Sequence, residues 1–157
     1  ECTLLEQHIG VEARGNLIGA ERFDDSIGVC AYRMDLHYST VGGGTVDLDT
    51  YPFQIPLGSL LPIRVDNLFP ACKNLGTTRL TNGSCRVHPA EWSIGEASGT
   101  LAAFALAKNV PPRGVRSDPK LLSEFQGILS KRGVMLSWPV FGPLLPSARI
   151  GYRPPPG

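Results

Sequence analysis

The sequence has no marked excess of charge of either sign. It carries 15 Lys and Arg residues against 14 Asp and Glu residues, which gives a formal net charge of +1. A nucleic-acid-binding surface usually shows a basic cluster, and an interaction tail shows a block of one sign. The composition therefore predicts no nucleic-acid partner.

The sequence also lacks a long apolar run. The longest candidate, residues 101–106, is far shorter than the ~20 residues that a transmembrane helix needs. No charged start followed by an apolar segment marks a signal peptide. We therefore expect no membrane span and a cytoplasmic location. Because the chain begins at Glu1 rather than at Met, we expect a processed chain or a fragment.

Cysteine is scarce, with Cys2, Cys30, Cys72 and Cys85 as the four examples. None of them forms a C-x-x-C pair, so the spacing predicts no metal site. Free thiols in a reducing compartment are one interpretation, and one or two disulfides are the other.

The rest of the composition is that of a folded domain. Hydrophobic residues make up 42% and charged residues 18% of the 157 positions, which is too apolar for a disordered chain. The 18 glycines and 14 prolines predict many turns and short regular elements outside two helices. The pattern favours an α+β fold.

Strand signals occupy the first half of the chain. Residues 27–38 carry apolar side chains on both alternating faces, which is typical of a buried strand, and glycines 42–44 mark a turn. Residues 51–63 contain three prolines and predict an extended, edge-like or irregular segment rather than a central strand. Residues 67–72 (NLFPAC) are a short strand candidate.

Two helices have clear start signals. The first begins near Pro89 and continues to about residue 108; its Gly95, Gly99 and Ala103 recur every fourth position. That face predicts close packing against a sheet, or against a flat ligand as the alternative. The second begins at residues 117–119, carries an apolar stripe and stops at Gly133. The proline-rich residues 139–157 are expected to lie extended on a surface.

Between the strand candidate and the first helix lies a polar segment, residues 73–86. It supplies hydrogen-bonding and basic side chains, namely Lys73, Asn74, Thr77, Thr78, Arg79, Thr81, Asn82 and Arg86. The helix that follows offers unpaired N–H groups and partial positive charge. Together they suit the edge of an anionic or electron-rich ligand, although a solvated surface loop is the plainer interpretation.

Two segments carry a family resemblance. Residues 67–76 (NLFPACKNLG) and 86–103 (RVHPAEWSIGEASGTLAA) resemble the C-terminal motif of the FAD-dependent oxidoreductases, roughly N-L-[LF]-x-A-[GC]-[RK], a loop, then R-x-x-P-x-x-x-x-x-G-x-A-[AS]-G-x-x-A-A. Upstream pieces at 25–28, 34–37, 51–56 and 59–62 resemble the family in the same order. The similarity covers about residues 23–138.

The resemblance implies a C-terminal fragment of a Rossmann-like FAD-binding fold. Residues 1–66 would form the β-rich substrate side, and residues 67–110 the last strand, loop and helix of the FAD-binding domain. Residues 111–138 would form the second, amphipathic helix, followed by the tail at 139–157.

The resemblance also implies site residues for FAD. Lys73 would stand near the ribityl chain, and Arg86, Val87 and His88 would bring the helix start to the isoalloxazine ring. Asn82 joins the predicted cofactor-binding set from the same loop. His88 is alternatively a helix-cap residue, and Cys72 is expected to be buried packing rather than a redox thiol.

Two residues are candidates for catalysis. Arg79 stands where relatives tend to carry His; because Arg stays protonated, it is suited to pairing with an anionic substrate or reduced flavin rather than to proton donation. His37 is either catalytic or a structural or surface histidine.

No G-x-G-x-x-G motif with a following acidic ribose binder occurs. The pyrophosphate site is therefore expected in an N-terminal FAD-binding half of the same protein, upstream of residue 1. Two functions follow. One is hydride transfer between a small-molecule substrate and FAD, and the other is a non-catalytic interaction or dimerisation module that retains the motif.

Overall fold

The computed structural model describes residues 1–38 and 40–138, and the expected extended tail at 139–157 lies outside them. The chain is a mixed α and β structure, as expected. Its elements are, in chain order, α1 (Glu6–Ile9), β1 (Ser26–Cys30), β2 (Met34–Leu36), β3 (Val46–Leu48), β4 (Phe53–Pro56), the 3-10 helix η1 (Leu57–Leu60), α2 (Arg79–Cys85), α3 (His88–Lys108), α4 (Pro112–Ser117) and α5 (Pro119–Lys131).

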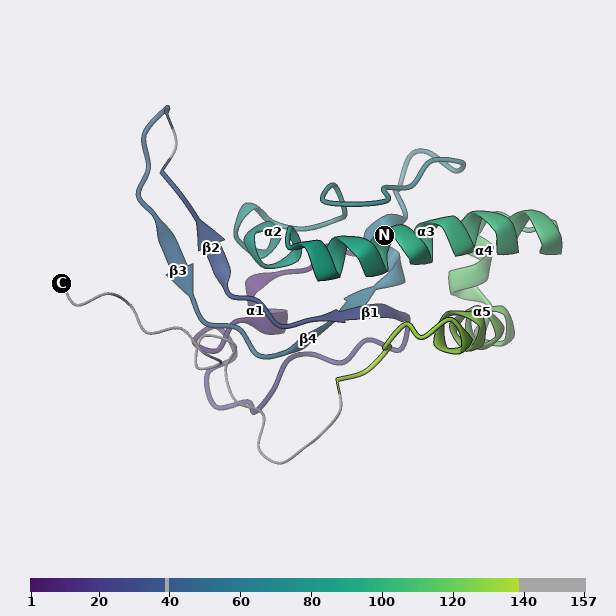
Figure 1. Cartoon of the computed structure of the whole chain (residues 1–157), viewed down its shortest axis with the longest axis horizontal. Helices are drawn as coiled ribbons and strands as arrows, with labels where there is room; N and C mark the ends of the chain where they lie inside the picture. Colours follow the sequence, from purple (N-terminus) through teal and green to yellow (C-terminus); the bar gives the residue numbers. More distant parts are fainter. Residues whose placement is uncertain (39, 139–157) are drawn as a thin grey trace.

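The strands form two small antiparallel sheets. β1 pairs with β4, with Cys30 opposite Phe53, and β2 pairs with β3, with Met34 opposite Leu48. Figure 1 shows α3 running along the β1–β4 pair, with α2 beside β2 at one end and α4 and α5 at the other. The β2–β3 hairpin projects from the body at the α2 end.

The core lies between α3 and the β1–β4 pair. Ile94 and Leu101 from α3 meet Ile27 and Ile55 from the strands, and all four are fully buried. Burying such a side chain stabilises the fold by roughly 1.5–3 kcal/mol. Gly28 lets the layers approach closely, because a Cβ there would lie 3.1 Å from the Ser93 Cβ.

Both predicted long helices are confirmed, and so are the residues that were predicted to start and end them. Pro89 occupies the first turn of α3, and Asn109 ends the helix in a left-handed conformation. The Asp118 side chain accepts hydrogen bonds from the backbone N–H groups of Lys120 and Leu121 and so caps α5. Gly133 follows the end of α5 with a φ of 89°.

The strand expected at residues 67–72 is wrong. This segment has no regular secondary structure and crosses the outside of α3, where the Ser98 hydroxyl donates to the Pro70 carbonyl at 2.6 Å. No strand of the described chain runs beside it, and an isolated strand without a ladder partner is not stable.

The polar segment 73–86 is also not a loop throughout, because its second half is α2. Thr78 caps this helix: its hydroxyl accepts from the Thr81 N–H at 3.1 Å, and the Thr81 hydroxyl accepts from the Thr78 N–H at 3.0 Å. This reciprocal pair satisfies two backbone donors at the helix start. In the sequence, the three-residue spacing of Thr78 and Thr81 is the only indication of this helix start. The polar composition of the surrounding residues predicts a loop instead.

The structure divides one predicted strand into two and confirms one predicted irregular segment. Residues 27–38 form two strands, β1 and β2, because the chain changes sheet between Cys30 and Met34. Residues 51–63 are confirmed as partly irregular, since the short β4 passes directly into η1. α1 and α4 were not expected; Pro111 and Pro112 start α4 instead of only ending α3.

The small-residue face of α3 is mostly open. A Cβ on Gly95 would contact the Ala71 carbonyl oxygen at 3.2 Å, whereas a Cβ on Gly99 would meet no atom within 4 Å. Ala103 is exposed. The expected close packing therefore holds only at Gly95, because the strands contact the opposite face of the helix.

Candidate functional site

The start of α3 borders a pocket with a volume of about 780 Å³. Three segments line it: the end of β1 and the residues after it, the α2–α3 junction, and the segment after α5. The lining residues are Val29, Cys30, Ala31, Tyr32, Arg86, Val87, His88, Pro89, Ala90, Ser93, Met135 and Trp138. The size falls within the usual range for small-molecule sites. Arg86, Val87 and His88, which were predicted to lie together at the cofactor, therefore line one pocket.

The α2–α3 junction contributes the polar side of the pocket. Val87 is the N-cap residue of α3, and no side chain caps the helix. The first backbone N–H groups of this 21-residue helix have no carbonyl partner within the helix, and they carry partial positive charge. His88 is thus the first helical residue rather than the cap. The helix start therefore favours an anionic or electron-rich ligand edge.

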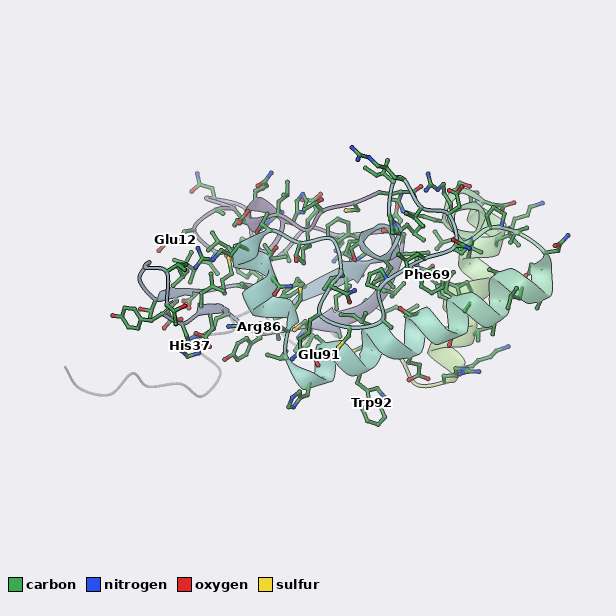
Figure 2. All side chains as sticks on the ribbon, turned by 90° about the horizontal axis from the view of Figure 1, so that it is seen from above. Glu12, His37, Phe69, Arg86, Glu91 and Trp92 are labelled. Atoms are coloured by element: carbon green, nitrogen blue, oxygen red, sulfur yellow. The ribbon has the colours of Figure 1, made fainter. Side chains whose placement is uncertain are left out.

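Arg86 adds a full positive charge at the same place. Its Nη2 donates a hydrogen bond to the Asp35 carbonyl oxygen at 2.8 Å, which ties the junction to β2. In Figure 2, Arg86 and His37 lie at the same end of the molecule, while Glu91 and Trp92 lie along the first turns of α3.

The third wall comes from the segment after α5. The Leu136 carbonyl accepts hydrogen bonds from the Ser26 hydroxyl at 2.7 Å and from the Gln54 amide at 2.8 Å. These contacts hold the segment after α5 against β1 and β4, the two strands of one sheet. Met135 and Trp138 thereby reach the pocket.

Tyr32 links the pocket to a small polar cluster. Its hydroxyl donates to the Asp35 Oδ2 at 3.1 Å, and the His37 Nε2 lies 3.3 Å from the same oxygen. Burial, followed by the hydrogen bond to Asp35 and the charge of that residue, raises the pKa of the Tyr32 phenol. Tyr32 is therefore a neutral proton donor near neutral pH.

Lys73 and Asn82 lie together but do not line this pocket. The Asn82 amide donates to the Lys73 carbonyl at 2.8 Å, and the Lys73 ammonium lies 3.3 Å from the Glu91 carboxylate. Asn82 thus holds the segment before α2, and Lys73 is placed against the first turn of α3.

Arg79 lies away from the pocket. It is exposed at the first position of α2, whereas Arg86 follows the last. A seven-residue helix separates its ends by roughly 10 Å. The two arginines that sequence reasoning placed in one site therefore stand at opposite ends of α2.

The residues missed by sequence reasoning come from distant parts of the chain. Tyr32 follows β1, and Met135 and Trp138 follow α5. Tyr32 and Met135 are partly exposed large side chains, yet exposure cannot be read from the sequence. Only the apolar alternation around Tyr32 offers a signal, and that pattern equally indicates strand packing.

The four cysteines are free thiols. Burial raises the pKa of Cys30 to about 12, and burial likewise raises the pKa of Cys85. Neither thiol forms a reactive thiolate near neutral pH. Among residues 1–38 and 40–138, no three His, Cys, Asp or Glu side chains gather in a way that could hold a metal ion. No helix in those ranges is long and apolar enough to cross a bilayer.

Comparison with known proteins gives one match. The model of the FAD dependent oxidoreductase family matches residues 1–129, most of the chain. No curated protein and no solved structure matches significantly. The matched range contains the α2–α3 junction and the end of β1, but it stops before Met135 and Trp138.

Proposed function

The chain belongs to the FAD dependent oxidoreductase family, and we propose that the pocket at the α2–α3 junction takes the isoalloxazine ring of FAD. Family membership gives a general flavoprotein oxidoreductase role that uses FAD. The proposal adds a place for the ring and a reaction, hydride transfer between a carbon of a small-molecule substrate and the flavin. One observation carries it: the arginine and helix start of the family-matched segment line the apolar pocket of about 780 Å³.

The pocket residues fit a flat aromatic ring. Val29, Ala31 and Val87 provide apolar walls, and the volume of about 780 Å³ accommodates a tricyclic ring with room beside it for a substrate. Arg86 and the α3 start provide positive charge on one side. FAD supplies the hydride acceptor or donor when it is bound.

Positive charge beside the pocket would favour the reduced form of a bound flavin. A flavin gains negative charge on reduction, and fixed positive groups stabilise that charge more than they stabilise the neutral oxidised ring. Arg86 is held by a backbone carbonyl, which carries no net charge, so its cationic field remains directed to the surroundings. We infer that Arg86 raises the affinity for the reduced flavin.

The pyrophosphate and ribose of FAD have no matching site in the described residues. No glycine-rich turn leads into α3, because Val87, His88 and Pro89 occupy its start. We propose that an N-terminal FAD-binding half supplies a Rossmann-like phosphate site, and that this chain supplies the ring side. On this proposal Lys73, anchored by Glu91 beside the first turn, faces the ribityl chain.

A non-catalytic assembly module is the second candidate, and one observation favours it. Trp92 and Leu106 on α3 are 78% and 82% exposed, although both are large and apolar. In Figure 2 the Trp92 side chain projects away from the body of the molecule. Such a face suits contact with another domain or a second copy. It is also compatible with the enzyme, whose FAD-binding half would cover it.

Titration with riboflavin and with FAD tests the ring site in the purified chain. We expect both to bind weakly and with equal affinity, because the adenosine diphosphate part finds no partner here. Ser93→Trp should abolish binding of both, since Ser93 lines the pocket. Ser123→Trp places the same ring on the exposed side of α5 and is the matched control.

The outcomes separate the candidates. Loss of binding in Ser93→Trp alone supports the flavin site. Absence of riboflavin binding in the unmodified chain removes the ring site and leaves the assembly module. FAD binding that is much tighter than riboflavin binding reveals a phosphate site within the chain and overturns the division into two halves.

A further inference from the structure

The Tyr32–Asp35–His37 cluster connects the pocket with bulk solvent. Tyr32 lines the pocket, and its hydroxyl donates to the Asp35 Oδ2 at 3.1 Å. The His37 Nε2 lies 3.3 Å from that same oxygen, and the His37 side chain is 77% exposed. Three groups that can each accept and release a proton therefore form one continuous path.

We propose that Tyr32, Asp35 and His37 form a proton relay between the pocket and water. This inference rests on the proposed function and assigns its proton pathway. Tyr32 is the member that meets the reacting molecule, so it is the proposed catalytic residue. Asp35 and His37 act through it.

The relay completes the balance of the proposed reaction. For oxidation of a substrate H–C–X–H group, with X as oxygen or nitrogen, bound FAD would supply the acceptor for the C–H hydride and its electron pair. The X–H proton must also leave as the C=X bond forms. Tyr32 accepts that proton on its oxygen and passes its own proton to the Asp35 carboxylate. Asp35 passes a proton to the His37 imidazole, and His37 releases one proton to water. Substrate reduction runs the same path in reverse.

The surrounding charges suit proton passage. Arg86 binds the Asp35 backbone carbonyl, which leaves the Asp35 carboxylate to Tyr32 and His37. The Arg33 guanidinium is paired with the Asp47 carboxylate across the β2–β3 hairpin. The raised pKa of the Tyr32 phenol keeps its proton in place until a proton arrives from the pocket.

The relay can be tested without the natural substrate. The probe is 2-naphthol, a flat aromatic photoacid that releases its hydroxyl proton when excited. The ratio of naphtholate to naphthol emission, excited beyond tryptophan absorption, reports transfer from the pocket to a nearby base. Competition by riboflavin and blockage by Ser93→Trp locate the probe in the pocket.

Tyr32→Phe and Asp35→Asn should each lower that ratio at least threefold when the occupancy of the pocket by the probe is matched to that of the unmodified chain. Asp35→Asn keeps the backbone carbonyl that Arg86 uses, so the pocket wall remains. His37→Gln should lower the ratio less, since water replaces an exposed group. Tyr38→Phe removes a hydroxyl from a tyrosine that is 79% exposed and should change nothing.

A wild-type ratio in both Tyr32→Phe and Asp35→Asn, at equal probe binding, overturns the relay. A chain that binds neither probe nor riboflavin overturns the relay and the ring site together. If riboflavin fails to bind but the naphthol result is as expected, the relay stands and the flavin assignment falls. If riboflavin binds and the naphthol ratio is the same in all variants, the flavin assignment stands and the relay falls.

Discussion

Arg86 donates a hydrogen bond to the backbone carbonyl of Asp35 at 2.8 Å, so the cation at the pocket edge is positioned by an uncharged partner. The contact joins the end of α2 to β2, residues that are 51 positions apart in the chain. A carboxylate partner would neutralise the field of Arg86, whereas a carbonyl fixes its direction and leaves its charge. The relationship explains how an exposed arginine is held in a fixed position beside the pocket.

The charge of Arg86 should therefore matter more than its bulk. Arg86→Met keeps an unbranched stem but removes the guanidinium, and we expect the affinity for reduced riboflavin to fall about tenfold, or roughly 1.4 kcal/mol. The affinity for oxidised riboflavin should fall by a smaller factor. Anaerobic fluorescence titration of both redox states measures the difference. Arg79→Met, at the other end of α2, is the control. A larger loss of affinity in Arg79→Met than in Arg86→Met would place the flavin near Arg79 instead.

Gly83 and Gly99 make a matched pair for stability. A Cβ on Gly83 would lie 2.8 Å from the Asp35 carbonyl oxygen, whereas a Cβ on Gly99 would meet no atom within 4 Å. Gly83→Ala should lower the free energy of unfolding by about 1–3 kcal/mol through overpacking of α2 on β2. Gly99→Ala should raise it by about 0.5–1 kcal/mol, because alanine favours the helix. Urea denaturation measures the free energy of unfolding of both variants. Equal effects of the two substitutions would contradict the described packing.

Asp25 anchors α4 to the start of β1. Its carboxylate accepts hydrogen bonds from the Arg116 Nε at 2.6 Å and the Gly58 N–H at 2.9 Å, and only 8% of the residue is exposed. Asp25→Ala should cost about 2–3 kcal/mol of unfolding free energy, less than the roughly 3–5 kcal/mol for a fully buried pair, because water reaches Arg116.

The comparison for Asp25 is Glu124→Ala, which breaks an exposed pair with Lys108 and should cost no more than about 0.5 kcal/mol. Thermal unfolding of both variants measures the contrast. If the two substitutions cost the same, the Asp25 pair is not a structural anchor.

The buried thiols should make the fold sensitive to alkali. Burial raises the pKa of Cys30 from its ordinary value of 9.0 to about 12, so about one Cys30 in ten thousand is a thiolate at pH 8. Thiol reagents should modify the partly exposed Cys72 first and reach Cys30 and Cys85 only on unfolding. Mass spectrometry of alkylated peptides identifies the order.

The sign of the pH effect follows from the same shift. In the unfolded chain Cys30 loses its proton near pH 9, whereas in the folded chain it keeps the proton to a higher pH. Its contribution to stability is therefore complete below pH 9 and is lost as the pH rises toward 12. Cys30→Ala and Cys85→Ala should flatten this loss. If the loss of stability at alkaline pH is the same in both variants as in the unmodified chain, ionisation of the buried thiols is not its cause.

Several features of this protein follow from local sequence. Pro89 in the first turn, Asp118 as a cap and Gly133 as a stop specify α3 and α5 through backbone chemistry that needs no distant partner. The motif at residues 86–103 likewise predicted the family, which the match over residues 1–129 shows.

Tertiary structure decided the rest, because the deciding partners lie far away in sequence. Residues 67–72 look like a strand, but no neighbouring strand of the described chain is there to complete a ladder, and the segment crosses α3 instead. Gly99 looks like a packing position, yet it is exposed, and a Cβ built there would meet no atom within 4 Å. The pocket forms only where β1, the α2–α3 junction and the segment after α5 converge, so Tyr32 and Trp138 became site residues through folding alone.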